Sequence, residues 1–463
     1  MKNMKKVLAL FLALVLALGC FGGCANEPPV ETTEPTEPPK QINEISEVAA
    51  LEAERCFAFF WEQVNLKEDS KGYGLIDDRA PSNGFASIAS VGFGMAAIPI
   101  GVENGWITYE EGLERAEKTL ASMKNLDTVH GFYYHFYTKR TGNPSKGVEV
   151  SCIDTALFIA GALVAGEYFG GNVETLAKEI YERIEWDWYV NPKNNRFYMG
   201  YNADKDIFSG AWDFYGEQLV MYFLGAGSPT HPVGIECYNS FTRSKVNYGG
   251  YDVIHSWFGS IFTYQFSHAF VDFRGIVDAK GVNWFDNSIN ATLVSHAYAQ
   301  EMSAEYKTLG PLSWGFTACD GPDGYSGLYG SAPSGSGSTA HYVDGTVPPC
   351  GAIGSFAFAP NLVMETMDYY YETLDGALFG EYGFYDAYNL DSMPTKAWIA
   401  KDVIGIDKGV SLLMIENYRS GLIWDLFMRC DFMDTALQVL QFQVDETPAE
   451  PFMGLPESVA NAG

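Results

Sequence analysis

Three acidic residues stand in apolar sequence, where an ionisable side chain is costly to bury. Glu217 lies in the aromatic stretch 212–218 (WDFYGEQ), directly before the apolar run 219–224. Asp154 lies inside the apolar segment 151–165, and Glu149 comes just before that segment. Burial raises the pKa of a carboxyl group, which is what a general acid requires at neutral pH. These residues predict hydrolysis by two carboxylates, one protonating a leaving oxygen and one activating water or attacking carbon.

Each of these acids also has a structural interpretation. Helix N-termini favour carboxylates, so Glu149 can be a capping residue and Asp154 a buried acid whose hydrogen bonds are satisfied. Glu217 can be an exposed glutamate in the first turn of a helix. Its aromatic and apolar neighbours make Glu217 the most informative of the three acids.

Other catalytic signatures are missing from the sequence. It contains no HExxH, Walker A, GxSxG or GxGxxG motif. His130 and His135 are five residues apart among tyrosines, a spacing poorly suited to metal ligation, and we interpret both as structural. We therefore expect neither a metal nor a cofactor.

Several polar and aromatic stretches are candidates for substrate subsites. Aspartates in Gly/Pro-rich loops commonly form Asx turns, but beside aromatic rings they can also bind sugar hydroxyls. The candidate binding residues are Tyr215, His268, Asp272, Arg274, Trp314, Asp320, Asp323 and Tyr325.

Helices of two kinds alternate in the sequence and must position these side chains. Segments 113–123, 173–184, 284–307 and 434–442 are apolar on one side, whereas 151–169, 214–224 and 404–430 are largely apolar. Alternating outer and inner helices predict an all-α, single-domain (α/α)6 barrel of six helical hairpins. An α-solenoid is the alternative, but no fixed repeat period is present. The Gly/Tyr/Asp-rich connection 321–345 is expected at one rim, where long loops are usually functional.

Composition limits the class of ligand. The 463 residues include 29 Lys and Arg against 58 Asp and Glu, giving a net charge of −29, and 15% are aromatic. A surface this acidic repels nucleic acids and anionic lipids, which favours a neutral or cationic substrate. The aromatic excess suits flat, neutral ligands such as sugars.

The N-terminal residues predict an exported lipoprotein. Residues 1–24 combine basic residues, a run of twelve apolar residues and the lipobox-like FGGC, which predicts lipidation at Cys24. An ordinary secretory signal is the alternative. A Pro/Glu/Thr-rich linker (25–45), a catalytic domain (46–445) and a C-terminal tail (446–463) follow. We expect a monomer on the outer face of a bacterial membrane, held there only by its lipid, with the remaining cysteines as buried free thiols.

The ordered motifs of the chain resemble those of one family. EVSCIDTALFIAGAL, YGE followed by GSPTHP, FSHAFVDFRG, WGFTACDGPDGY, DGTVPPCGAIGSFAFAP and IGIDKGVSLLMIENYRSGLIW together resemble the glycoamylase-like domain, which includes bacterial β-1,2-glucanases of glycoside hydrolase family 144. The resemblance runs from about residue 55 to residue 442. It implies an (α/α)6 barrel and metal-free, inverting hydrolysis of a neutral β-glucan. It also implies that Glu217 and Glu149 are the key acids, with Asp154 nearby; Ser145 and Lys146 stand where some relatives have a further acid.

The sequence thus predicts a lipid-anchored glycoside hydrolase acting on β-1,2-glucan or its oligosaccharides. Glu217 is the predicted general acid, and Glu149 or Asp154 acts opposite it. Two alternatives stay open: a non-catalytic glucan-binding lipoprotein that supplies a transporter, and an enzyme of the same fold with another linkage preference.

Overall fold

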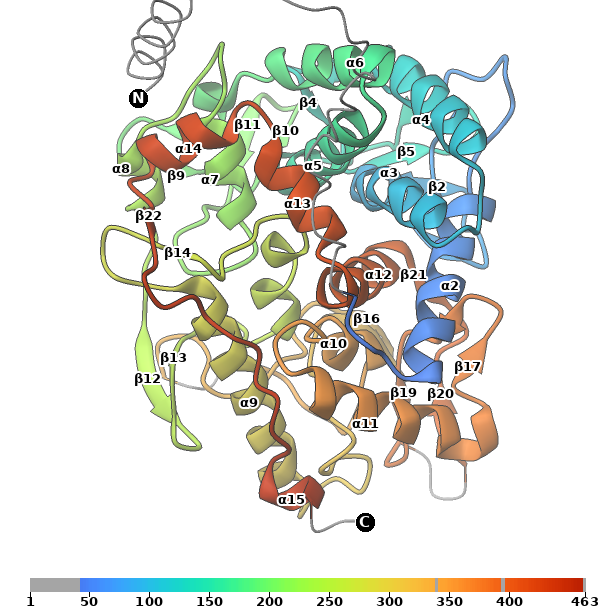
Figure 1. The fold of residues 1–463 in the computed structure, drawn as a ribbon, viewed down its shortest axis with the longest axis vertical. Helices are drawn as coiled ribbons and strands as arrows, with labels where there is room; N and C mark the ends of the chain where they lie inside the picture. Colours follow the sequence, from blue (N-terminus) through green and yellow to red (C-terminus); the bar gives the residue numbers. More distant parts are fainter. Residues whose placement is uncertain (1–41, 338–339, 393–395, 461–463) are drawn as a thin grey trace, which may run out of the picture. The chain divides into compact units, whose positions relative to one another are not determined.

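Inner and outer helices alternate along the chain in the computed structural model, which describes residues 42–337, 340–392 and 396–460 (Figure 1). These residues belong to one compact unit, Ile42–Gly463. Cys24, the signal segment and almost all of the predicted linker lie outside the described residues.

Among the described residues, five helices and a pair of 3-10 turns form the closed inner ring. Neighbouring members contact one another around this ring. Ser267 bonds the two short 3-10 turns to Val220 in the inner helix before them, and Gln265 bonds them to Gly351 in the inner helix after them. The predicted (α/α)6 arrangement is confirmed. In chain order the inner elements are α3 (Ile88–Glu103), α5 (Cys152–Phe169), α7 (Leu219–Ala226), the turns η2 (Ile261–Tyr264) and η3 (Ser267–Ala269), α10 (Pro349–Ile353) and α12 (Gly405–Arg419).

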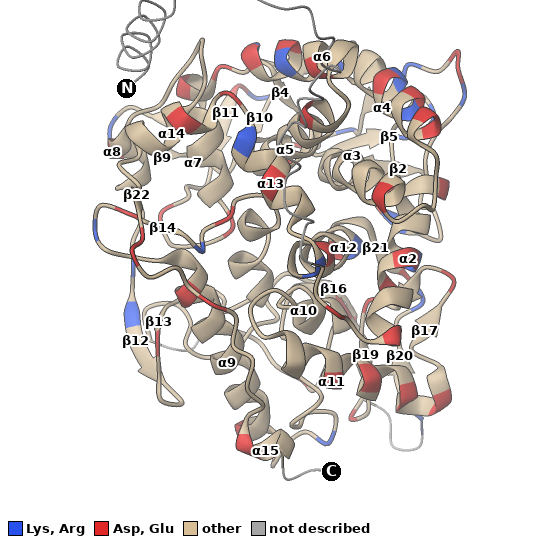
Figure 2. Ribbon diagram, in the orientation of Figure 1, with Lys and Arg blue, Asp and Glu red and all other residues tan. Residues whose placement is uncertain are grey.

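The outer helices cover this ring. Ser46, Thr108 and Asn283 cap three of them with side-chain oxygens, as their residue types favour. The outer helices are α2 (Glu47–Glu62), α4 (Tyr109–Met123), α6 (Gly171–Glu182), α9 (Trp284–Met302), α11 (Pro360–Glu372) and α14 (Met433–Val439), supplemented by α8 (Ile235–Tyr238), α13 (Leu422–Arg429) and α15 (Glu457–Ala460). Charged residues line α4 and α6 (Figure 2), whereas every residue of α7 is buried.

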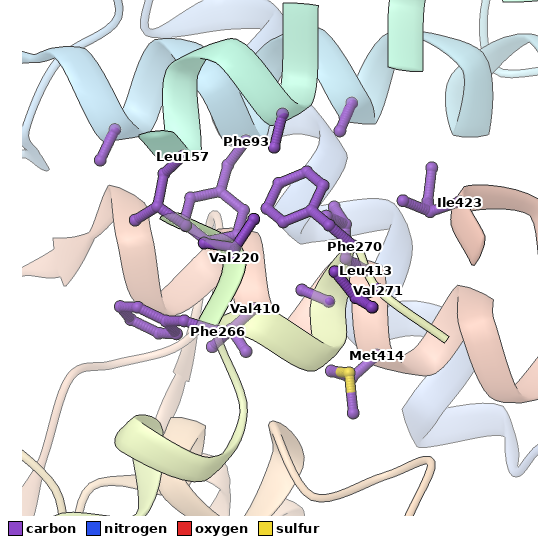
Figure 3. Packing of buried hydrophobic residues seen from close by; sticks show 14 of the residues in the cluster. Phe93, Leu157, Val220, Phe266, Phe270, Val271, Val410, Leu413, Met414 and Ile423 are labelled. Carbon is purple, nitrogen blue, oxygen red and sulfur yellow. The ribbon is translucent and has the colours of Figure 1, made fainter. Parts of the chain in front are cut away.

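Side chains from the inner elements fill the centre of the ring. Phe93, Leu157, Val220, Phe266, Phe270, Val410 and Leu413 meet there (Figure 3). Two glycines let α3 and α5 approach backbone to backbone. A Cβ on Gly161 would lie 1.8 Å from the carbonyl oxygen of Gly92, so no larger residue fits without separating the helices.

Short strands connect the helices. Among the described residues they are two to four residues long, and all their pairings are antiparallel. The pairs are β1 (Arg79–Ala80) with β21 (Val403–Ile404), β3 (Thr128–Val129) with β4 (Phe132–Tyr133), β8 (Val190–Asn191) with β9 (Arg196–Phe197), β12 (Lys245–Tyr248) with β13 (Tyr251–Ile254), β14 (Ile276–Val277) with β22 (Gln443–Val444), β15 (Cys319–Gly321) with β16 (Gly324–Ser326), β17 (Phe379–Gly380) with β18 (Gly383–Phe384), and β19 (Tyr388–Asn389) with β20 (Trp398–Ile399). Three-stranded sheets join β2 (Phe85–Ser87), β5 (Phe136–Thr138) and β6 (Asn143–Pro144), and β7 (Val150–Ser151), β10 (Gly200–Asn202) and β11 (Ile207–Ser209).

Some predicted helix boundaries are wrong. The predicted inner helix 404–430 divides into α12 and α13 because Gly421 adopts a left-handed conformation, with φ of 69°. The predicted helix 214–224 begins only at Leu219, because Tyr215 donates a backbone hydrogen bond to the Thr242 carbonyl and holds the preceding residues extended. The predicted outer helix 284–307 ends at Met302.

The ends of the described unit pack against the helices. Asn43, at the end of the predicted linker, donates its backbone N–H to the carbonyl of Arg419. In the predicted tail, Phe452 donates to the carbonyl of Phe358, and Ala449 and Val459 are buried. In the described unit the folded domain therefore extends beyond the predicted boundaries at both ends.

Helix α5 has the length and composition of a membrane span, but most of it is buried among the other helices. Its apolar character is explained by its inner position. The six described cysteines are buried and free, as predicted.

Candidate active site

An aromatic-walled cavity contains the predicted acid Glu217. Its volume is about 530 Å³, and it is formed by the segment before α7, the segment leading into η2, and the β15–β16 hairpin. Its lining residues are Met199, Ala211, Trp212, Asp213, Phe214, Tyr215, Gly216, Glu217, Ser256, Trp257, Phe258, Ser260, Phe262, Thr263, Ala318, Tyr325 and Gly327.

Glu217 lies in the turn that leads into α7. The hydroxyl of Ser267 donates a 2.5 Å hydrogen bond to the carbonyl oxygen of Glu217 and accepts one of 2.9 Å from the N–H of Val220. The backbone of Glu217 is thereby held between α7 and η3, while its side chain remains partly exposed to the cavity.

The pKa of Glu217 is raised to about 7, mainly by burial and to a smaller extent by the negative charge of Asp154, while a hydrogen bond from its own backbone N–H opposes the shift. A carboxyl group with this pKa is largely protonated in mildly acidic solution. It is therefore suited to donate a proton to a leaving oxygen.

Glu149, Asp154 and His135 form a cluster on neighbouring elements. Nδ1 of His135 lies 2.8 Å from Oε1 of Glu149, and Nε2 lies 3.6 Å from Oδ1 of Asp154. Ser151, the N-cap of α5, donates a 2.5 Å hydrogen bond to Asp154 Oδ2. These acids are not lining residues of the cavity, but a Cβ on Gly200, next to cavity residue Met199, would lie 3.3 Å from Glu149 Cγ.

The pKa values of His135 and Glu149 are both shifted in this cluster. Burial by itself lowers the pKa of His135, but the charges of Asp154 and Glu149 and the hydrogen bond to Glu149 outweigh it and raise the pKa to about 9. In turn, the hydrogen bond from His135 lowers the pKa of Glu149. The cluster thus contains an ionised carboxylate, the state that a catalytic base needs.

Aromatic side chains provide sugar-sized surfaces in the cavity. Trp257 is 44% exposed and Tyr325 is 53% exposed, although both line the cavity wall. Phe214 meets Trp257 edge-on with ring centroids 5.5 Å apart. Tyr215 is buried and stacks on Trp284 at 4.9 Å, so it supports the wall from behind. Exposed rings beside a carboxyl group are the arrangement that pyranose rings stack upon.

Four predicted binding residues lie elsewhere. His268 is buried between Phe273, Phe285 and Phe358, and burial lowers its pKa to about 3. Trp314 is fully buried and donates its indole N–H to Thr366. Asp272 and Arg274 form a two-pronged ion pair with N–O distances of 2.9 and 2.8 Å, and the Arg274 guanidinium lies over Trp424. None of these four residues lines the cavity.

The predicted motif DGPDGY forms the β15–β16 hairpin. Tyr325 reaches the cavity, whereas Asp323 is exposed at the turn. Asp320 pairs with Arg79 at 3.2 Å, and Arg79 also contacts Asp78 and Asp402. Asp320 therefore ties the hairpin to the β1–β21 pair.

One buried set of three possible metal ligands exists among the described residues: Cys350, Asp386 and Asp407. Burial raises the pKa of Asp407 to about 6 and raises that of Asp386 well above its usual range. A proton shared by the two acids explains their close approach without an ion.

Sequence reasoning missed His135 and Trp257. The spacing of His135 from His130 predicts a structural histidine, whereas its partners Glu149 and Asp154 lie 14 and 19 residues further along the chain. Trp257 belongs to the aromatic-containing stretch 255–262 (HSWFGSIF), whose composition does not distinguish it from the stretch around the buried Trp314.

The chain resembles the glycoamylase-like family, which is described as putative glucoamylase. The Glycoamylase family model matches residues 209–431, and the predicted resemblance to this family is confirmed.

Two comparisons with individual proteins agree with this resemblance. The chain is 27% identical over 432 residues to the exo-β-1,2-glucooligosaccharide sophorohydrolase (non-reducing end) of Parabacteroides distasonis, covering 84% of this chain and 57% of that protein. It is also 27% identical to the endo-β-1,2-glucanase of Chitinophaga pinensis, whose structure contains sophorotriose and glucose. Those two structures align with a TM-score of 0.74, covering 86% and 99% of the respective chains.

A second solved structure has the same fold. The β-1,2-glucanase of Parabacteroides distasonis aligns with a TM-score of 0.75 at 25% identity, covering 85% of this chain and 60% of that one. The chain thus spans a little over half the length of the Parabacteroides sophorohydrolase and nearly all of the Chitinophaga glucanase structure.

Proposed function

We propose that this protein is a glycoside hydrolase that cleaves β-1,2-glucan or its oligosaccharides. One observation carries the proposal: Glu217, whose pKa burial raises to about 7, reaches into a cavity with exposed aromatic rings. A protonated carboxyl group in such a cavity suits proton donation to a glycosidic oxygen.

The cluster around His135 supplies the second carboxylate of the proposed reaction. Glu149 or Asp154 acts opposite Glu217, and we propose that it activates the attacking water. The outcome is then inversion at the anomeric carbon, which in such enzymes accompanies carboxyl groups roughly 6.5 to 9.5 Å apart.

The substrate class follows from the cavity and from the related proteins. The acidic chain disfavours an anionic polymer, and Trp257 and Tyr325 suit uncharged pyranose rings. The Parabacteroides and Chitinophaga proteins are named for β-1,2-linked glucans, which supports the same linkage here.

We also propose that the protein is exported and held at the outer face of a bacterial membrane by a lipid on Cys24, acting there as a monomer. The basic residues, the twelve-residue apolar run and the sequence FGGC support this location. Mass spectrometry of the membrane fraction tests it: a diacylglyceryl group on Cys24 supports the anchor, and an intact or differently cleaved N-terminus overturns it.

Incubation of the purified protein with β-1,2-, β-1,3-, β-1,4- and α-glucans tests the activity. We expect thin-layer chromatography to show products from the β-1,2-glucan only, and ¹H NMR of early products to show the inverted anomer. Products from another linkage would support the alternative specificity. Tight binding without products would overturn the enzymatic proposal in favour of a glucan-binding lipoprotein.

The variant Glu217→Gln tests the assigned acid in the same assay. It removes the transferable proton and preserves the shape of the side chain, so turnover should fall by about a thousandfold or more. A Glu217→Gln variant that retains normal turnover would show that the acid is another residue.

A further inference from the structure

His135 contacts two acids with its two ring nitrogens. It lies between β4 and β5, and its neighbours across the sheet are the residues that lead into α5. Nδ1 is 2.8 Å from Glu149 Oε1, and Nε2 is 3.6 Å from Asp154 Oδ1. Nδ1 is within hydrogen-bond distance of one carboxylate and Nε2 is within ion-pair distance of the other, an arrangement that favours the imidazolium form of the ring.

The backbone and the ring of His135 are both fixed in place. Its N–H donates to the carbonyl of Glu149 at 3.0 Å, and its carbonyl accepts from the N–H of Ile88, the first residue of α3. The ring stacks on Phe136 with centroids 3.8 Å apart. His135 is thus bound to Glu149 through both the main chain and the side chain.

The charged groups around the ring are predominantly acidic. Besides Glu149 and Asp154, Asp78 acts on His135 from the residue before β1, and Asp78 is itself paired with Arg79 at 3.3 Å. The Asp154 carboxylate also accepts the hydroxyl hydrogen of Ser151. Because both Glu149 and Asp154 contact the ring, a positive charge on His135 is attracted to both carboxylates.

We propose that His135 is a positioning residue that holds the Glu149 and Asp154 carboxylates on either side of its ring, so that one of them serves as base while Glu217 serves as acid. This inference rests on the proposed hydrolytic function. It adds a role for a residue that does not line the cavity: the His135 ring lies between Glu149 and Asp154, while Glu217 is the proposed acid in the cavity wall.

Three substitutions at His135 test this role through the pH dependence of kcat/KM. His135→Phe keeps the stacking on Phe136 but removes the charge and both donors, so the acidic limb should move upward by about one pH unit or more. The value of kcat should fall by about tenfold or more. His135→Asn and His135→Gln each restore one neutral donor, so they should recover part of kcat while the acidic limb stays displaced.

His130→Asn is the matched control. His130 lies five residues away, pairs with Glu185 at 2.6 Å and stacks on Trp188. Its φ is 49°, a left-handed conformation that asparagine tolerates. This variant should have the pH profile of the unaltered protein. An unshifted acidic limb in His135→Phe, or a uniform loss of rate without a shift, would overturn the proposal.

A readout independent of catalysis separates this inference from the proposed function. ¹⁵N NMR of histidine-labelled protein, assigned by comparison with His135→Asn, should show both ring nitrogens of His135 protonated at pH 7.5. A neutral imidazole at that pH would overturn the inference even if the enzyme cleaves glucan. Normal turnover in Glu217→Gln would refute the assigned acid, yet the ring protonation would still test the pairing.

Discussion

The hydroxyl of Ser267 donates a 2.5 Å hydrogen bond to the carbonyl oxygen of Glu217 and so ties the acid-bearing turn to η3. The same hydroxyl accepts the N–H of Val220, in the first turn of α7. Ser267 is buried, so its loss leaves two backbone groups without this partner.

Ser267→Ala should therefore loosen the turn that carries Glu217. We expect the free energy of unfolding to fall by about 1 to 3 kcal/mol, because buried polar groups lose their hydrogen bonds. We expect kcat to fall about tenfold, because a small displacement of the acid is costly for proton transfer. Chemical denaturation and steady-state kinetics measure the two effects. Unchanged kcat would show that the turn holds Glu217 without Ser267.

The pKa of Glu217 predicts how activity and stability depend on pH. The acid must be protonated to act, so activity should decline as pH rises through about 7. Burial raises the pKa above its ordinary value of 4.5, so ionisation destabilises the fold. The contribution of Glu217 to stability should therefore be greatest below pH 4.5 and should be lost as the pH rises through about 7.

Glu217→Gln should remove this pH-dependent loss of stability. At pH 8 the variant should be more stable than the unaltered protein by about 2 kcal/mol, and at pH 4 the two should be equal. Calorimetry at the two pH values measures the difference. A variant that is less stable at pH 8 would contradict burial as the cause of the raised pKa.

Asp154 contributes to the raised pKa of Glu217 through its negative charge. Asp154→Asn removes that charge, so the alkaline limb of the residual activity should move to lower pH. Glu149→Gln should leave that limb in place. Whichever of the two variants loses about a thousandfold in kcat identifies the base. An alkaline limb that moves upward in Asp154→Asn would contradict the electrostatic coupling.

Trp257 should contribute to substrate binding and little to stability. Its ring is 44% exposed in the cavity wall, so Trp257→Ala should raise KM by about tenfold with a melting temperature close to that of the unaltered protein. Tyr109, equally exposed on the outer helix α4, provides a control: Tyr109→Ala should leave KM unchanged. Equal effects of the two substitutions would argue against stacking at Trp257.

The buried pair Lys408 and Glu52 joins α12 to α2. Nζ of Lys408 lies 2.8 Å from Glu52 Oε1, and both side chains are almost completely buried. Lys408→Met would leave the Glu52 charge unpaired and should cost about 3 to 5 kcal/mol of stability. Lys178 of α6 makes two exposed ion pairs, with Glu174 and Asp431. Lys178→Met breaks both and should cost less than about 1 kcal/mol of stability. Denaturant titrations of the two variants compare these costs.

The sequence by itself determined the layers of the barrel and singled out Glu217 as a candidate acid. Helical periodicity shows which faces are apolar, so α5 and α7 could be recognised as inner helices and α4 and α6 as outer ones. Glu217 stood out because a carboxyl group among aromatic residues is costly to bury. Both features are encoded by residues adjacent in the chain.

Tertiary packing decided which side chains meet. Trp314 and His268 are core residues, whereas Trp257 faces the cavity, and an aromatic ring in a loop carries no local signal that separates these outcomes. The pairing of His135 with Glu149 and Asp154 likewise depends on where the β4–β5 connection lies against the start of α5. Burial and ion pairing are properties of segments brought together by the fold, so the spacing of residues along the chain could not predict them.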